Sequence, residues 1–301
     1  MGAYKKVAFC IVALGFAVVP LCLTAAQEAA RPVSDDAVLK GILENTGLYC
    51  KKLQDFMYYF VCHEFVTETI RGATKTRPSQ PSMGGMTGAY GGAEGTTFSV
   101  TSGSTKNTYL YDYQMVRKKG NNQESRTLLK KNGQNQVVPN ARLEAIRFYF
   151  QNMAFGPIDV FGTAGRLKHN YRIVGSEKIK GQNATIIEAA PKDDSPDYNP
   201  SGKVWLRESD NAILKIEWDQ RSLFGFKDVQ AAAEKIKLTP VISLVAEYGV
   251  EKNGIRFPSR VVFQEAYVRN KDKKKRLASD VTIDYKDYQF FTVDVDVDYK
   301  K

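Results

Sequence analysis

The stretch KVWLRESDNAILKIEW at residues 203–218 decides the fold class of this chain. It consists of two apolar runs on either side of the polar letters ESDN, which is the pattern of two antiparallel β-strands joined by a short turn. In the second run, Leu214, Ile216 and Trp218 alternate with charged residues. Because successive side chains of a strand point to opposite faces, we expect these three residues to share the apolar face of a sheet.

Similar strand–turn–strand segments follow one another from residue 109 almost to the end of the chain. Hairpin turns are predicted at Lys180-Gly181-Gln182 and Lys252-Asn253-Gly254, and a further turn at 271–275. The predicted strands are 109–116, 125–130, 167–179, 183–189, 203–207, 212–218, 241–250, 257–269 and 276–288. With so few helical segments among them, they predict a mainly β (α+β) domain built on a meandering antiparallel sheet or barrel.

The apolar face of this predicted sheet needs a cover of helices, of a second sheet or of a ligand. Two helices are predicted, at 36–54 and 141–153, and together they give only ~48 Å of helix. Two alternatives follow: the sheet curls and fills its own core, or it is a partly open barrel with an apolar cavity for a lipid-like ligand. In the second case the apolar groove would be lined by Tyr111, Tyr113, Leu214, Ile216, Trp218, Phe263, Tyr267, Ile283 and Tyr285.

The N-terminus has the layout of a secretory signal peptide. Lys5 and Lys6 precede an almost wholly apolar run, 7–23, and small residues end at Ala26. An uncleaved membrane anchor is the alternative, because the apolar run is at the short limit for a membrane span. We therefore expect export to the periplasm or cell envelope, cleavage near Ala26, and a single β domain over 27–301.

Two cysteines remain after the predicted cleavage, Cys50 and Cys62. Cys50 lies on the apolar side of the first predicted helix, and Cys62 lies in a predicted strand, 58–70, that follows it. A chain reversal between the two elements would bring the sulfur atoms together. In an oxidising compartment this predicts a Cys50–Cys62 disulfide, with two buried free thiols as the alternative.

A compositional break follows the predicted strand 58–70. Residues 71–108 are rich in Gly, Ser and Thr, and they have almost no apolar periodicity. Such a segment buries too little apolar surface to offset the entropy lost on ordering. It also lacks the spacing of a phosphate-binding loop. We predict a flexible surface loop.

Basic residues outnumber acidic residues by 43 to 33, which gives a formal net charge of +10. Two basic clusters, 117–119 and 271–276, fall at predicted turns. They keep loops soluble or, alternatively, attract an anionic membrane surface or an acidic partner. Nucleic acid is not an expected partner of an exported protein.

Catalytic and metal-binding motifs are not found. His63-Glu64 begins a zinc-protease motif, but position 67 is Thr, and His169 is the only other histidine. A GxSxG motif is also missing. We therefore predict no cofactor, no metal site and no enzymatic activity.

Three segments carry a resemblance to a known family: KVWLRESDNAILKIEW (203–218), AEYGVEKNGIRFPSRVVF (246–263) and DVTIDYKDYQF (280–290). Together with the signal peptide and the N-terminal helix, they resemble the LolA/LolB-like periplasmic lipoprotein-sorting superfamily, and most closely its uncharacterised exported members. The resemblance implies a curved, unclosed antiparallel sheet, or half-barrel, on which an N-terminal helix and a short second helix pack. It also implies that the concave apolar side holds acyl chains.

Two hypotheses for the function follow. The first is an exported protein that binds a lipid or a lipoprotein acyl chain in the apolar groove, in a carrier or sorting-like role. The second is a non-enzymatic interaction or structural protein of the envelope with a self-filled β core. A cavity of several hundred cubic ångströms lined by strands would favour the first hypothesis, and a face packed solid by Trp218, Phe263 and Tyr285 would favour the second.

Overall fold

The structure is a computed structural model that describes residues 35–71, 103–143, 145, 155–193, 200–223 and 225–291. The predicted signal peptide, 1–26, lies outside these residues, as does nearly all of the predicted helix 141–153. Within that predicted helix, residues 141–143 have no regular secondary structure. All described residues belong to the structural unit that begins at Asp35.

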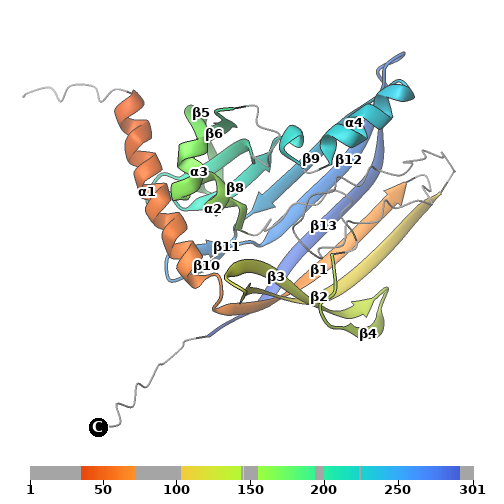
Figure 1. Ribbon diagram of the computed structural model, residues 1–301, viewed down its shortest axis with the longest axis horizontal. Helices are drawn as coiled ribbons and strands as arrows, with labels where there is room; N and C mark the ends of the chain where they lie inside the picture. Colours follow the sequence, from red (N-terminus) through yellow and green to blue (C-terminus); the bar gives the residue numbers. More distant parts are fainter. Residues whose placement is uncertain are drawn as a thin grey trace, which may run out of the picture. The chain divides into compact units, whose positions relative to one another are not determined.

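One antiparallel sheet of 11 strands dominates this unit (Figure 1). Its spatial order is β4-β3-β2-β1-β13-β12-β9-β8-β7-β6-β5, so β4 and β5 are its edges and the sheet is not closed. The strands are β1 (Phe60–Arg71), β2 (Ser104–Lys118), β3 (Asn121–Lys131), β4 (Gln134–Val138), β5 (His169–Ile179), β6 (Gln182–Pro191), β7 (Gly202–Arg207), β8 (Ile213–Trp218), β9 (Leu238–Glu247), β12 (Arg260–Arg269) and β13 (Lys275–Phe290). The predicted fold class is confirmed.

Local turn chemistry joins most neighbouring strands. Lys180 and Gly181 link β5 to β6 with φ angles of 47° and 85°, and Asn253 and Gly254 have φ angles of 54° and 71°. Positive φ at both central positions is typical of a type I′ turn, whose twist matches that of the flanking strands. The Asn253-Gly254 turn closes a separate two-stranded sheet of β10 (Val250–Lys252) and β11 (Ile255–Phe257).

The predicted strand 257–269 is therefore divided. Phe257 ends β11, and Arg260 begins β12 after Pro258 and Ser259. Proline has no backbone N–H to donate to a neighbouring strand, so it favours a break at this point. Beyond the break, β12 pairs with β9 from Arg260↔Glu247 to Arg269↔Leu238, as the predicted hairpin requires.

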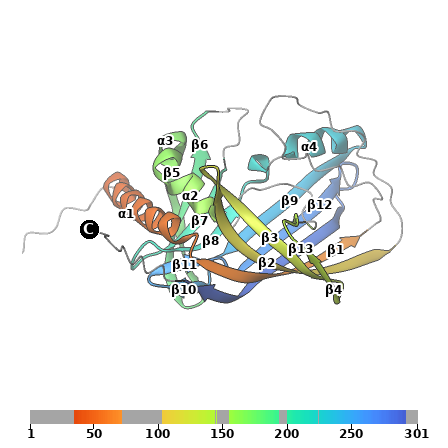
Figure 2. The same ribbon diagram turned by 60° about the horizontal axis from the view of Figure 1, so that its bottom comes forward.

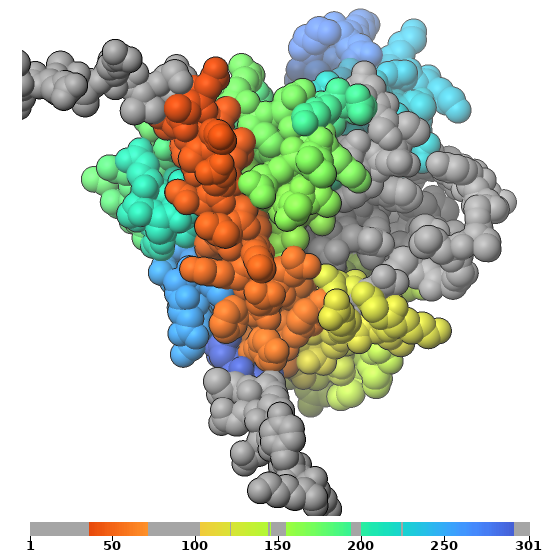
Figure 3. Space-filling view, turned by 60° about the vertical axis from the view of Figure 1, so that its left-hand side comes forward, coloured from red at the N-terminus to blue at the C-terminus, as the bar shows by residue number. Residues whose placement is uncertain are grey.

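The N-terminal helix α1 (Asp35–Phe56) is confirmed. It packs against α2 (Gly156–Phe161), β11 and β5 (Figure 1). Helix α3 (Thr163–Lys168) follows α2, and in Figure 3 the orange-red α1 lies beside the green segment that contains these two helices. Helix α4 (Phe226–Lys235) and the 3₁₀ turn η2 (Gln220–Ser222) lie beside β9. The sequence did not predict α2, α3, α4 or η2. In the described part of the chain, no helix combines the length and the apolar character needed to cross a membrane.

The predicted loop 71–108 is shorter at both ends than expected. Strand β1 extends to Arg71, and β2 begins at Ser104, its pairing partner in the sheet. Thr105 and Asn107 are likewise strand residues that pair with β1. Residues 72–102 of the predicted loop lie outside the described residues.

Candidate functional site

One face of the sheet, which we call the inner face, carries the helices and the main core (Figure 2). Tyr49 and Leu53 of α1 share a single cluster of buried residues with side chains from most strands of the sheet. Seven of the nine predicted groove residues belong to that cluster: Tyr111, Tyr113, Ile216, Trp218, Phe263, Ile283 and Tyr285. The alternation of the sequence therefore placed these seven residues on a common face.

Leu214 does not share this face. It packs with Ala184 and Trp205 in a small second cluster, whereas its neighbour Ile213 belongs to the main cluster. The cause is a β-bulge: Trp205 pairs with Lys215 and Leu206 pairs with Ile213, so Leu214 has no partner in β7. An extra residue shifts the alternation beyond it by one position. The prediction that Leu214 faces the groove with Ile216 was wrong.

Tyr267 is buried but belongs to neither cluster. Its hydroxyl donates to Glu265 Oε1 at 2.5 Å, and Ser279 Oγ donates to Glu265 Oε2 at 3.0 Å. Glu265 is itself buried, with 1% of its surface exposed. At this end of β12 the inner face is therefore polar rather than apolar.

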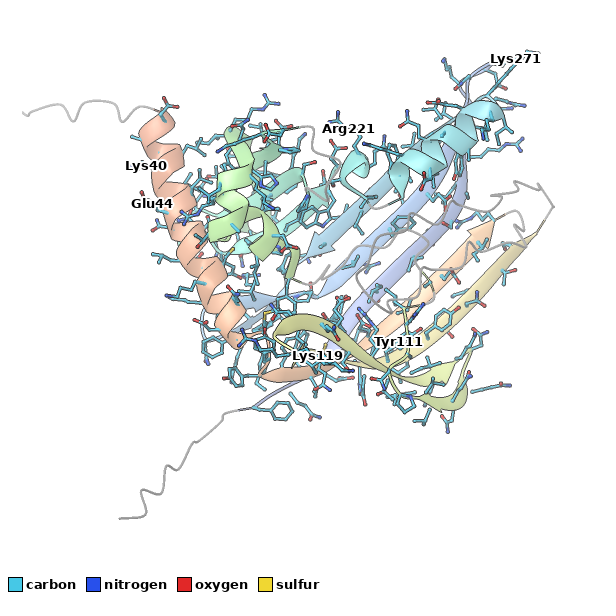
Figure 4. The ribbon with its side chains drawn as sticks, viewed as in Figure 1. Lys40, Glu44, Tyr111, Lys119, Arg221 and Lys271 are labelled. Carbon is cyan, nitrogen blue, oxygen red and sulfur yellow. The ribbon has the colours of Figure 1, made fainter. Side chains whose placement is uncertain are left out.

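The described helices lie unevenly on the inner face. Helices α1 and α3 contact β5, α1 also contacts β11, and α4 contacts β9. Among the described residues, no helix has more than marginal contact with β1, β2 or β13. Tyr111, labelled in Figure 4, lies on β2 in this part of the sheet. The same holds for β12, so the inner face of β2, β1, β13 and β12 has the least helical cover within the described residues, although its side chains are buried, and we treat it as the candidate site.

A buried ion cluster crosses this site. Arg126 of β3 donates to both carboxylate oxygens of Glu64 in β1, from Nε to Oε2 at 2.6 Å and from Nη2 to Oε1 at 2.9 Å. It also contacts Glu124 at 3.1 Å. The Arg126 guanidinium also lies 4.8 Å from the ring centre of Tyr113, which is on β2, the strand between β1 and β3. The cluster therefore links three neighbouring strands, β1, β2 and β3, through side chains.

Burial and neighbouring charges shift the pKa values of Glu64 and Arg126 in opposite directions. Glu64 is fully buried, and burial raises the pKa of its carboxyl despite the opposing effect of Arg126. Burial lowers the pKa of Arg126, but Glu124 and Glu64 outweigh it, so that pKa lies well above its ordinary value. The guanidinium is thus permanently charged, and it needs a carboxylate partner because an unpaired charge is costly in a low-dielectric interior.

A third buried carboxylate, Glu68, lies further along β1. Its Oε2 accepts a hydrogen bond from Asn107 Nδ2 at 2.8 Å and a long one from the Tyr109 hydroxyl at 3.5 Å. Both donors come from β2, the neighbouring strand. Hydrogen-bonded carboxylates therefore recur along the inner face of β1.

Sequence reasoning missed these polar residues, although a signal was present. Phe60, Cys62, Glu64, Val66 and Glu68 alternate along β1, and all five are buried. Two acidic residues in step with buried apolar residues indicate carboxylates on a core face. The partner of Glu64, 62 positions away, follows only from the strand order β3-β2-β1.

The opposite, outer face holds a second cluster around His63. Its Nδ1 lies 2.9 Å from Asp287 Oδ2, and its Nε2 lies 3.2 Å from Asp112 Oδ1. A carboxylate oxygen therefore lies within hydrogen-bond distance of each ring nitrogen of His63. His63, Asp112 and Asp287 line a pocket of about 280 Å³. Throughout the described residues, no His, Cys, Asp and Glu side chains form a group that could hold a metal.

The predicted disulfide is not present: Cys50 and Cys62 are both buried free thiols. Cys50 Sγ donates to the carbonyl oxygen of Pro157 at 3.6 Å, so its side chain is directed at α2 rather than at β1. Cys62 lies on the inner face of β1. The chain does reverse between α1 and β1, but the helix faces α2, which the sequence did not predict.

We expect both thiols to resist alkylation in the native protein. Burial raises the pKa of Cys50 to about 12 and that of Cys62 still further above its ordinary value, which removes the reactive thiolate at neutral pH. In denaturant without reductant, peptide mapping should show both residues alkylated. Recovery of a peptide pair joined by Cys50 and Cys62 would contradict the structure and restore the disulfide.

No protein-family model and no curated protein matches the chain. Among solved structures, a DUF1329 family protein from Desulfovibrio piger is 11% identical, with 83% of this chain and 92% of that chain covered and a TM-score of 0.38. A LolA superfamily protein from Nitrosomonas europaea is 12% identical, with 85% and 94% covered and a TM-score of 0.33.

A third structure is a candidate outer membrane lipoprotein-sorting protein domain from Vibrio parahaemolyticus. It is 11% identical, with 83% of this chain and 92% of that chain covered and a TM-score of 0.37. One of these structures, the protein from Nitrosomonas europaea, is a member of the LolA superfamily, which the sequence resembles. At such identities and TM-scores, the likeness carries no ligand, activity or partner over to this chain.

Proposed function

We propose that this is an exported, non-enzymatic envelope protein that binds a lipid or a lipoprotein acyl chain on the inner face of β2, β1, β13 and β12. One observation carries the proposal: these strands direct aromatic and aliphatic side chains toward the inner face, while the described helices lie mainly on β5, β9 and β11. The side chains on this face are buried, so an acyl chain would enter by parting them and would then take over part of their cover.

The chemistry of the face suits such a ligand. Tyr113, Phe263, Ile283 and Tyr285 offer carbon surface from neighbouring strands. Burying a long acyl chain releases on the order of 0.8 kcal/mol per methylene before the cost of ordering, so no charged contact is needed for affinity. The hydrogen-bonded polar groups around Glu265 at one end of the face would then orient a headgroup.

A second candidate function is an interaction or structural protein whose sheet fills its own core. Its support is the burial of the proposed groove: Trp218, Phe263 and Tyr285 expose 5%, 1% and 2% of their surfaces. An acyl chain could enter only if such side chains moved apart. The two functions therefore differ in whether the inner face opens.

The test is titration of the mature protein with a fluorescent fatty-acyl probe. We expect binding at micromolar concentration or tighter, and its loss in Ile283→Glu, which places a carboxylate on the proposed binding face. Thr282→Glu is the matched control, since Thr282 neighbours Ile283 on β13 but is partly exposed. It should bind the probe normally.

Each variant must first give a native circular dichroism spectrum and a cooperative melt, because a buried charge can also unfold the protein. Native mass spectrometry of the protein purified from membrane-containing cells supplies an independent readout. If the folded wild type takes up no probe and releases no lipid on extraction, acyl binding is wrong and the interaction-protein function replaces it.

A further inference from the structure

Two basic segments that are far apart in the sequence meet at one end of the sheet (Figure 1). One is the end of α4, and the other is the hairpin between β12 and β13, where Lys271 is labelled in Figure 4. Asn270 joins them, since its backbone N–H donates to the Lys237 carbonyl oxygen at 3.1 Å and its Oδ1 accepts from Thr239 Oγ1 at 2.8 Å. We call the resulting surface the basic tip, formed by Lys235, Lys237, Lys271, Lys273, Lys274, Lys275 and Arg276.

The positive charge of the basic tip is not neutralised within the described residues. All seven side chains are exposed, and none of them is in an ion pair with another described residue. Two acidic residues interrupt the segments, and both have other partners. Asp272 pairs with Arg269 at 2.6 Å, and Glu234 accepts a hydrogen bond from Gln230 at 3.0 Å.

An exposed apolar side chain lies among these charges. Ile236 stands between Lys235 and Lys237, and 46% of its surface is exposed. A protruding hairpin with lysines around one isoleucine offers no concave groove for a peptide, but it can rest on a flat charged surface. Clusters of four to eight basic residues of this kind attract anionic headgroups, and a neighbouring apolar side chain can enter the boundary of the acyl region.

We propose that the basic tip docks the protein onto an anionic lipid bilayer. The docking would set an orientation, because the hairpin joins β12 and β13 and α4 packs beside β9. The hairpin end of the inner face would then meet the membrane, where an acyl chain could pass between bilayer and protein. This last consequence rests on the proposed function, whereas the docking itself does not.

Sedimentation with lipid vesicles tests the docking. The mature protein should bind vesicles of equal parts phosphatidylglycerol and phosphatidylcholine, and should not bind phosphatidylcholine alone. The variant K271E/K273E/K274E should bind the mixed vesicles about tenfold or more weakly, since each basic residue near the surface contributes separately. High salt should weaken wild-type binding in the same way.

A matched control comes from the other basic cluster. The variant R117E/K118E/K119E changes the net charge by the same amount at the β2–β3 turn, where Figure 4 labels Lys119 well away from Lys271. It should keep wild-type binding within about twofold if the tip is the docking surface. Equal losses in both variants would overturn the proposal, because they would indicate attraction by net charge alone.

Two further outcomes would also overturn it: failure of the wild type to bind the anionic vesicles, and tip-dependent binding to an acidic polypeptide or DNA without vesicle binding. Acyl-probe uptake in vesicle-free solution separates this proposal from the proposed function. The tip variant should take up the probe like the wild type. A wild type that docks on vesicles but takes up no probe would refute acyl binding and leave docking intact.

Discussion

Arg126→Met is expected to lower the free energy of unfolding by about 3–5 kcal/mol, because it leaves the carboxylate of Glu64 buried and without its cation. Glu64 is fully buried, and both of its oxygens accept hydrogen bonds from Arg126. Methionine keeps much of the side-chain volume, so the loss reports charge rather than a cavity. Urea denaturation followed by circular dichroism measures the change.

Two controls isolate the effect. Arg172→Met removes a cross-strand Arg–Glu pair at the sheet edge, where 72% of the Arg172 side chain is exposed, and it should cost much less stability than Arg126→Met because solvent screens an exposed pair. The double variant Glu64→Gln/Arg126→Met should be more stable than Arg126→Met alone, because it also removes the fully buried carboxylate of Glu64 and leaves only Glu124 without its cation. A loss for Arg126→Met no larger than that for Arg172→Met would show that the buried cluster adds little to stability.

Gly165→Ala should destabilise the protein by about 3 kcal/mol through a clash between helices α2 and α3. A Cβ at Gly165 would lie 2.2 Å from the carbonyl oxygen of Asp159 and 2.5 Å from that of Val160. Both neighbours are backbone atoms, so the clash can be relieved only by moving the helices apart. Thermal and chemical unfolding of the purified variant measure the loss.

Gly41→Ala is the opposite case and serves as the control. Gly41 lies within α1, and no atom would come within 4 Å of an added Cβ. Alanine favours a helix over glycine by up to about 1 kcal/mol, so this variant should be slightly more stable than the wild type. If Gly165→Ala proved as stable as Gly41→Ala, the close contact between α2 and α3 would be wrong.

The strands and the inner face could be predicted because their signals are local. A Lys-Gly or Asn-Gly pair indicates a turn from two adjacent residues, and the alternation of apolar and polar residues over about five positions indicates which side chains share a face of the sheet. The prediction failed where one extra residue was inserted: the bulge at Leu214 leaves the composition of β8 unchanged but moves that side chain to another cluster. Helices α2 and α3, of six residues each, are too short to show helical periodicity.

The rest of the candidate site depends on which strands are neighbours. Glu64 meets Arg126 only because β1 and β3 flank β2, and β1 is held on its other side by β13 from the far end of the chain. The disulfide prediction had the same weakness. It assumed that α1 packs on β1, whereas the Cys50 thiol is directed at Pro157 of α2. Such pairings come from long-range topology rather than from any local pattern.

The open sheet has one further consequence, for polymerisation. In the described part of the chain, β4 and β5 each have only one neighbouring strand, so each could template the addition of a foreign strand. Both edges are irregular: the β5–β6 register shifts between Ile173 and Gly175, and the β3–β4 register shifts between Leu128 and Lys130. A bulge bends an edge strand and increases its local twist, which makes the edge a poorer template for an added strand. The same bulges that interrupt the ladder would thus oppose the edge-to-edge growth of a concentrated protein into fibres.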